Sequence, residues 1–211
     1  EGLLYRLWGG AKRAGDKSVY TRRLSRSAVT DAMRRIGEAA ADKIREGELI
    51  FIGSGKTTLA LTECVAAKNV TVVTNGLPQL EILSKRQVNV FLLCGFFKEY
   101  SRSVVGRQTV EMLKNYHFDK AFLGVRGLGE DFSLLSGDEY EYDIKNVCMQ
   151  NARETFILAD HSKFGRAAMY AASSEQCRNL SIITDIPIAG AGQWEPERQA
   201  YIRSIGGKQS I

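Results

Sequence analysis

The sequence has few of the residues that build metal sites and disulfide scaffolds. Its 211 residues include two histidines and four cysteines, and the cysteines are scattered with no CxxC pair. A zinc site or a disulfide framework therefore has little support, and reduced thiols in a cytosolic protein are the expected state. No apolar run approaches the roughly 18 residues of a membrane span. We expect a cytoplasmic protein with no metal, no cofactor and no membrane partner.

The net charge of +5 is distributed unevenly along the chain. Residues 1–45 hold eleven Lys and Arg against five Asp and Glu, a balance of +6, whereas the remainder holds eighteen against nineteen, a balance of −1. A basic first segment on a near-neutral body indicates that the front of the chain approaches a polyanion such as DNA. A solvated helical face is the alternative explanation.

Hydrophobic spacing divides the chain into a short first part and a longer second part. Residues 1–21 are glycine-rich and basic without sustained periodicity, and apolar residues then recur at helical spacing over 22–45. Strands are expected at 49–52, 70–74, 88–93, 120–124, 154–159 and 180–184, and helices at 57–66, 78–84, 108–116 and 139–152. This alternation predicts an α/β fold with a parallel-rich sheet and helices on both faces. Loops beyond the carboxyl ends of such strands converge on one crevice, where ligands bind.

One motif follows the first expected strand and opens a helix. It combines two glycines, three hydroxyl residues and a lysine: Gly53, Ser54, Gly55, Lys56, Thr57 and Thr58. Glycines let the backbone approach a ligand closely, and the first amides of a helix have no intrahelical partners, so a phosphate or carboxylate is the natural occupant. A tight turn without a ligand is the alternative. An ATP-binding P-loop is disfavoured, because it needs a glycine where Ile50 stands.

Polar and charged residues also follow the other expected strands. The candidates for ligand contacts there are Thr74, Asn75, Gly95, Lys98, Arg126, Asp138, Glu139 and Lys163. Amide and carboxylate groups that bind hydroxyls, together with Lys and Arg as counter-charges, would suit a phosphorylated sugar. Each residue alone also fits a turn, a helix end or a solvated surface. Their shared location at strand ends favours the functional interpretation.

These residues together resemble the sensor domain of DeoR-type transcriptional regulators over about residues 22–185. The matching strings are Gly53-Ser54-Gly55-x-Thr57-Thr58, Val72-Val73-Thr74-Asn75, Asp119-Lys120-Ala121-Phe122-Leu123-Gly124, Asp138-Glu139-x-Glu141 and Leu158-Ala159-Asp160-x-Ser162-Lys163-Phe164-Gly165. The last string is the most specific. The resemblance implies a fold similar to that of sugar-phosphate isomerases and coenzyme A transferases.

The first eleven residues resemble the wing that closes the family's N-terminal winged helix-turn-helix. On this resemblance, residues 1–21 are the remnant of the wing and a linker, residues 22–211 are the effector-sensing α/β domain, and the recognition helix lies upstream of Glu1. The family resemblance implies a homo-oligomeric regulator, a repressor of a sugar catabolic operon. It also implies that a phosphorylated sugar changes the hold of the regulator on operator DNA.

The sequence departs from the family pattern at four positions near the expected ligand. Phe96 replaces a glycine, Lys56 replaces a small hydroxyl residue, Arg126 replaces a small or acidic residue, and His161 replaces a serine. These departures leave the identity of the sugar open.

Two other functions stay open at this point. One is a sugar-phosphate isomerase of the same fold, in which Asp138, Glu139 and Lys163 would supply proton transfer and enediolate stabilisation. The other is an interaction module whose pocket holds no ligand.

Overall fold

The computed structural model describes residues 29–186, except for 67–68, 87, 130–131, 167, 174–176 and 178, and four short strands outside that range. The first two of these strands, β1 (Leu4–Leu7) and β2 (Gly10–Arg13), pair antiparallel with each other. The others are β14 (Gln193–Glu195) and β15 (Ala200–Ile205). The rest of the expected wing and linker lies outside the described residues.

Six parallel strands form most of one eight-stranded sheet, from one edge inward. In spatial order they are β13 (Leu180–Thr184), β11 (Ala152–Leu158), β8 (Phe118–Gly124), β3 (Leu49–Ile52), β4 (Thr71–Thr74) and β5 (Asn89–Leu92). The strand β15 adds antiparallel to β13, and β14 adds to β15. The predicted parallel-rich sheet is therefore confirmed.

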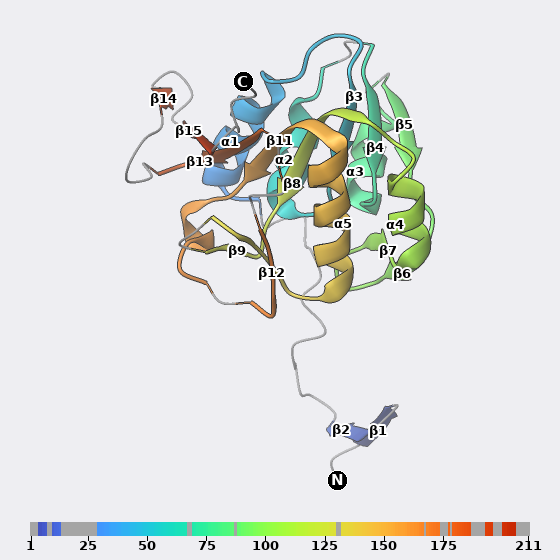
Figure 1. The fold of residues 1–211 in the computed structure, drawn as a ribbon. Helices are drawn as coiled ribbons and strands as arrows, with labels where there is room; N and C mark the ends of the chain where they lie inside the picture. The colour runs from blue at the N-terminus through green and yellow to red at the C-terminus, as the bar shows by residue number, and fades with distance from the viewer. Residues whose placement is uncertain are drawn as a thin grey trace.

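Helices cover both faces of this sheet, as the sequence predicts (Figure 1). Three of them lie on one face, namely α1 (Asp31–Ala41), α2 (Lys56–Cys64) and α3 (Leu77–Leu83), and α4 (Arg107–Leu113) and α5 (Glu139–Asn151) lie on the other. Successive side chains of a strand point to opposite faces. Ile50 and Ile52 of β3 accordingly pack beneath α1 and α2, whereas Phe51 packs in the core on the α4 and α5 side.

The order of the strands reverses once, between β3 and β8. From β3 the chain runs outward through β4 to β5, and it then returns to place β8 on the opposite side of β3 before continuing to β11 and β13. The loops after β3 and β8 consequently diverge and leave a crevice at the carboxyl edge of the sheet. Ligands of open α/β sheets bind at such switch points.

Several short elements were not predicted from the sequence. They are β6 (Phe96–Lys98), β7 (Ser103–Val105), β9 (Gly127–Leu128), β10 (Leu134–Ser136), β12 (Tyr170–Ala172) and the 3-10 turn His161–Lys163. β6 and β7 form a hairpin, and β12, β10 and β9 form a small antiparallel sheet. Strands of two or three residues are too short to show a hydrophobic period.

The helix expected over 22–45 is shorter within the described residues. It begins after Thr30, whose hydroxyl accepts a hydrogen bond from the backbone N–H of Met33 (3.3 Å), and it ends at Ala41. Such a hydroxyl cap fixes a helix start. Ile44 is buried beyond the helix end, so the apolar spacing continued past the helix itself.

A close approach between α1 and α2 fixes the position of α2. A Cβ atom added at Gly37 of α1 would lie 2.6 Å from the backbone N of Leu61 and 2.7 Å from the carbonyl carbon of Ala60. Both contacts are with backbone of α2, which has no flexible side chain end to move away. The small residue therefore sets the spacing of the two helices.

We predict that Gly37→Ala destabilises the fold, although alanine in a helix is normally about 1 kcal/mol more favourable than glycine. Overpacking costs about 1–3 kcal/mol, so the net effect should be a loss of up to about 2 kcal/mol in the free energy of unfolding. Urea unfolding of the two chains measures this difference in the free energy of unfolding. The exposed neighbour Glu38→Ala should stay within about 0.5 kcal/mol of the original chain. A more stable Gly37→Ala chain would show that the helices have room to separate.

A histidine anchors the turn that follows β11. The backbone N–H of His161 donates to Asp185 Oδ1 (2.7 Å), and its ring Nδ1 lies 2.6 Å from Asp185 Oδ2. The hydrogen bond and the charge of Asp185 raise the pKa of His161 above its ordinary value of 6.5. This contact ties the loop after β11 to the end of β13.

The stabilising effect of this pair should depend on pH. Because the folded pKa of His161 is raised, its contribution is fully present below 6.5 and is lost as pH rises through the folded pKa. The melting temperature of the original chain should exceed that of His161→Gln in acidic buffer, and the difference should shrink in alkaline buffer. A difference that grows with pH would contradict the pairing.

Candidate anion-binding site

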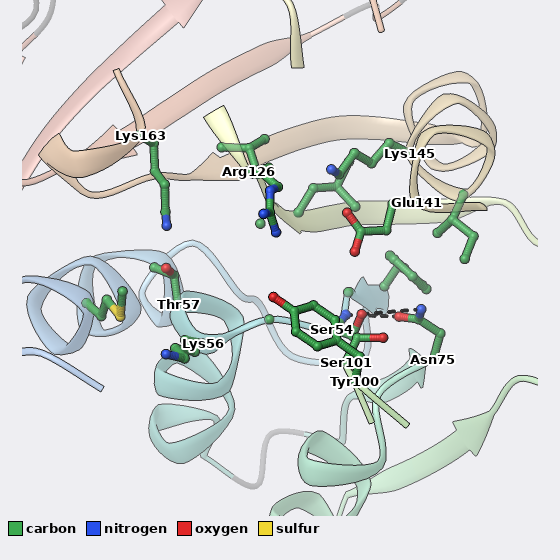
Figure 2. Close-up of a pocket in the computed structure, with 18 of the residues that line it drawn as sticks. Ser54, Lys56, Thr57, Asn75, Tyr100, Ser101, Arg126, Glu141, Lys145 and Lys163 are labelled. Carbon is green, nitrogen blue, oxygen red and sulfur yellow. Dashed lines mark hydrogen bonds between the residues drawn. The ribbon is translucent and has the colours of Figure 1, made fainter. Parts of the chain in front are cut away.

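A cleft of about 590 Å³ opens at the switch point between β3 and β8. The loops after β3, β4, β8 and β11 line it, together with α5 and the turn of the β6–β7 hairpin (Figure 2). The volume lies within the range of small-molecule sites. The predicted convergence of strand-end loops is therefore present in the fold.

The start of α2 presents unpaired backbone donors to this cleft. Among the described residues, the backbone N–H groups of Lys56 and Thr57, which line the cleft, make no hydrogen bond. The first intrahelical bond runs from Leu59 N to Gly55 O (3.0 Å), and Gly55 provides no side-chain cap. These donors and the helix dipole together favour an anion at this point.

The conformation of Gly55 makes this arrangement possible. Its φ of +152° is one that side-chain-bearing residues rarely adopt, and an added Cβ would lie 3.3 Å from Thr58 Oγ1. Glycine therefore lets the chain turn from β3 into α2, and it has no side chain that would cover the first amides of the helix.

The Asn75 side chain holds the preceding part of the loop. Its Oδ1 accepts a hydrogen bond from Ser54 N (2.9 Å), and its Nδ2 donates to Val104 O (3.2 Å) on β7 and to Ser54 Oγ (3.5 Å). The backbone N–H of Gly53 is also engaged, since it donates to Phe122 O (3.0 Å). The free donors are thus confined to the helix start, and Asn75 serves as a brace of the cleft.

Four basic side chains surround the helix start. Figure 2 shows Lys163 and Arg126 extending from the opposite wall toward Lys56, and Arg166 also lines the cleft. Burial lowers the pKa of Lys163, Asp160 opposes this effect, and the other three cations lower the pKa further. The nearest carboxylate oxygen, Asp160 Oδ2, lies 4.0 Å from Lys163 Nζ. Four cations face the carboxylate of Asp160, and this excess of positive charge favours a bound anion.

A second polar group lies on the α5 wall of the cleft (Figure 2). Lys145 is only 6% exposed, and its Nζ donates to Ser136 Oγ (2.8 Å). Burial lowers the pKa of Lys145, and the charges of Glu141 and Asp138 oppose that effect. Glu141 is half-buried and lines the same wall. This end of the cleft offers both a hydrogen-bond donor and a carboxylate acceptor.

The structure brings eight of the predicted contact residues to the cleft. They are Gly53, Ser54, Gly55, Lys56, Thr57, Asn75, Arg126 and Lys163. Six others do not line it, namely Thr58, Thr74, Gly95, Lys98, Asp138 and Glu139.

Two of these six are buried threonines whose hydroxyls bond to the backbone. Thr58 Oγ1 donates to Gly55 O (3.1 Å), and Thr74 Oγ1 donates to Ile52 O (2.7 Å) and accepts from Gly76 N (3.1 Å). The Thr74 bond joins the ends of β3 and β4, and the Thr58 bond lies within the start of α2. A hydroxyl already bonded in this way has no free donor for a ligand.

The other four lie outside the lining of the cleft. Lys98 forms an ion pair with Asp138, whose Oδ1 also accepts from Glu141 N (3.1 Å) and so caps α5. Glu139 is exposed on the first turn of that helix. Gly95 has a φ of +142°, and an added Cβ there would lie 2.3 Å from Thr109 Oγ1, so only glycine fits.

Five polar or charged lining residues were missed as site candidates. Lys145 lies inside the helix expected over 139–152 and was not chosen as a contact. Its spacing of four residues from Glu141 places both side chains on one face of that helix. Tyr100 and Ser101 belong to the turn of the unpredicted hairpin, and Arg166 directly follows the most specific family string. Glu141 stood in the matching acidic string but was not chosen as a contact.

Two further properties concern the described part of the chain. It contains no group of three or more His, Cys, Asp or Glu side chains placed to hold a metal ion. None of its helices combines the length and the apolar character needed to cross a membrane.

One solved structure shares the α/β fold of this chain. The eIF2B delta subunit of Chaetomium thermophilum aligns with a TM-score of 0.54 and 14% identity over 71% of this chain and 54% of that chain. A ribose 5-phosphate isomerase of Methanocaldococcus jannaschii aligns with a TM-score of 0.46 and 16% identity over 63% of this chain and 53% of that chain.

Comparison of sequences shows the family. The chain is 31% identical over 172 residues to the glycerol-3-phosphate regulon repressor of Escherichia coli, covering 80% of this chain and 68% of that protein. It is 35% identical over 141 residues to the HTH-type transcriptional regulator IolR of Bacillus subtilis, covering 66% of this chain and 56% of that protein. The model of the DeoR C-terminal sensor domain matches residues 29–185. The chain therefore belongs to the DeoR family and contains its sensor domain.

Proposed function

We propose that this chain carries the effector-sensing domain of a transcriptional repressor of a sugar catabolic operon, and that its effector is a phosphorylated sugar. The names of the matched relatives support regulation of transcription, and the Escherichia coli relative is named for a phosphate ester. Because the chain spans only 56% to 68% of these relatives, the action on DNA is part of the proposal.

The unpaired amides at the start of α2 are the observation that carries this proposal. A phosphate above Lys56 and Thr57 would accept their N–H groups, which make no other hydrogen bond among the described residues. Lys163 and Arg126 reach the same space from the opposite wall and would neutralise its charge (Figure 2). Hydrogen bonds between ionised groups are stronger than neutral ones, so this end would supply much of the affinity.

The other end of the cleft suits the sugar. Lys145 and Glu141 offer a donor and an acceptor, and Tyr100 and Ser101 add hydroxyl groups from the hairpin turn. A site that hydrogen-bonds hydroxyl groups rejects analogues lacking them, because its buried polar groups are then left unpaired. This arrangement supports selection among sugar phosphates by their hydroxyl pattern.

Operator DNA and a second subunit complete the proposed regulator. The antiparallel pairing of β1 with β2 supports the assignment of residues 1–21 as a wing and linker, with residues 22–211 as the sensor. The ligand would bias one of two arrangements of the DNA-binding segments, by no more than its difference in affinity for them.

One observation favours an enzyme as a second candidate. Glu141 and Lys145 lie in the same cleft as the anion site, and an aldose–ketose isomerase needs a carboxylate base and a cationic group near the phosphorylated substrate. The names of the relatives favour the regulator instead.

Thermal unfolding with a panel of phosphorylated sugars, their parent sugars and ATP tests the effector class. A ligand at a hundred times its Kd adds about 2.7 kcal/mol of stability. At about 2–4 °C per kcal/mol for a chain of this size, the shift is several degrees. We expect a shift with one sugar phosphate and none with its parent sugar. A shift with ATP alone, or no shift with any compound of the panel, would count against the proposal.

The variants Lys163→Ala and Thr57→Val should each raise the Kd of that sugar phosphate by about 10-fold to 150-fold. This change corresponds to about 1.5–3 kcal/mol for a hydrogen bond to a charged group. Calorimetric titration measures the Kd. Lys114→Ala is the matched control, because Lys114 is an exposed lysine of the other helical face that pairs with Glu111. Equal Kd values for the original chain and the three variants would show that the phosphate does not bind at the start of α2.

Incubation of the chain with aldose and ketose phosphates distinguishes the enzyme from the regulator. We expect no interconversion above that of the free sugars. Turnover that disappears in Glu141→Gln would establish the isomerase and displace the regulator.

A further inference from the structure

A buried glutamine of α3 contacts the loop that opens the anion site. Gln79 is 1% exposed and does not line the cleft, but its Nε2 donates to Gly55 O (3.0 Å) and lies 3.4 Å from Thr58 Oγ1. Gln79 and Leu83 are the two buried residues of α3, and Leu83 packs in the hydrophobic core. The helix α3 therefore uses one buried position for packing and the other for a polar contact with the start of α2.

Fold stability alone does not account for this amide. Its Oε1 is buried and accepts no hydrogen bond among the described residues, and a buried acceptor without a partner lowers the free energy of unfolding. The Nε2 end must face Gly55 O, because two acceptors cannot bond to each other. A Cβ atom added at Gly76 would collide with Gln79 Oε1, so glycine at the start of α3 gives the amide its room. The contact with Gly55 indicates a role other than packing.

The carbonyl that Gln79 contacts is restrained by three donors. Gly55 O accepts from Leu59 N (3.0 Å), from Thr58 Oγ1 (3.1 Å) and from Gln79 Nε2 (3.0 Å). The first two donors belong to the same helix that the carbonyl opens, whereas Gln79 comes from a separate helix. Gln79 is consequently the one of these donors that ties the direction of this carbonyl to another part of the fold.

The direction of this carbonyl determines the direction of a donor in the cleft. Gly55 O and the N–H of Lys56 belong to one planar trans peptide group, in which the two bonds point in opposite directions. Glycine leaves such a group more conformational freedom than any other residue. Holding Gly55 O in place therefore holds the N–H of Lys56, which makes no hydrogen bond among the described residues. Donors on the carbonyl also polarise the peptide and strengthen its N–H as a donor.

We propose that Gln79 is a positioning residue that sets the anion affinity of the α2 start by fixing the peptide group between Gly55 and Lys56. This inference rests on the proposed function, because it needs an anion at that place, and it adds a residue that touches no ligand. Asn75 acts on the preceding part of the same loop, where its Oδ1 accepts from Ser54 N. Two buried amides that lie four residues apart thus restrain two different peptide groups of one loop.

Calorimetric titration of the full chain with sulfate tests the proposal. Gln79→Leu has a similar size and no donor, so it should raise the sulfate Kd by about 2-fold to 12-fold. This change corresponds to one neutral hydrogen bond of about 0.5–1.5 kcal/mol. Gln108→Leu is the matched control, because Gln108 is an exposed glutamine of α4, and it should leave the Kd unchanged. A folded Gln79→Leu chain with the original Kd would overturn the proposal.

Nuclear magnetic resonance of the original chain gives a result that does not depend on the folding of a variant. On addition of sulfate, the backbone amide signal of Lys56 should shift, and the side-chain amide signal of Gln79 should shift with it. The two groups are joined through the peptide that follows Gly55, although Gln79 lies outside the cleft. The side-chain amide of Gln108 should not respond. A Gln79 signal that stays in place while that of Lys56 moves would overturn the proposal.

The same titrations keep this inference separate from the proposed function. Sulfate binding that is equal in the original chain and in Gln79→Leu would remove the positioning role and leave the anion site. An original chain that binds no sulfate would remove the anion site, and the role of Gln79 with it.

Discussion

The cleft depends on the hydrogen bonds of one buried side chain, Asn75. It accepts from the backbone of Ser54 after β3 and donates to the carbonyl of Val104 on β7, so it joins three separate segments at the carboxyl edge of the sheet. Because these bonds occupy the loop, the donors left free are those of the α2 start. Through its bond to Val104, Asn75 also positions the β6–β7 hairpin, whose turn lines one side of the cleft.

The basic side chains around this helix start are held together at an electrostatic cost. Lys163 is partly buried, and the charges of Lys56, Arg126 and Arg166 disfavour its protonated form. The packing of the sheet and the helices holds them in place, and an anion would relieve their repulsion. A site of this kind responds strongly to a charged ligand, because binding adds an attraction and removes a repulsion at once.

The sequence predicted the large elements of the fold more fully than the details of the site. β3 and β13 have the bounds expected from their apolar runs, because parallel strands covered on both faces are largely apolar. The β6–β7 hairpin was missed since its strands have three residues each, and Tyr100 was missed with it. Thr74 and Asp138 were expected to contact the ligand, but a sequence does not distinguish a hydroxyl or carboxylate that faces a ligand from one that caps its own backbone.

The strand β5 pairs only with β4 within the described part of the chain and contains no charged residue, and this uncharged edge has a consequence for the choice of partner. Backbone hydrogen bonds are the same for every sequence, and phenyl rings accept many apolar surfaces, so this edge carries little information about which chain lies against it. Related chains made in the same cell with a similar open edge would not be turned away by charge at this point. Any selectivity for a strand that pairs at this edge would therefore have to come from the residues around it.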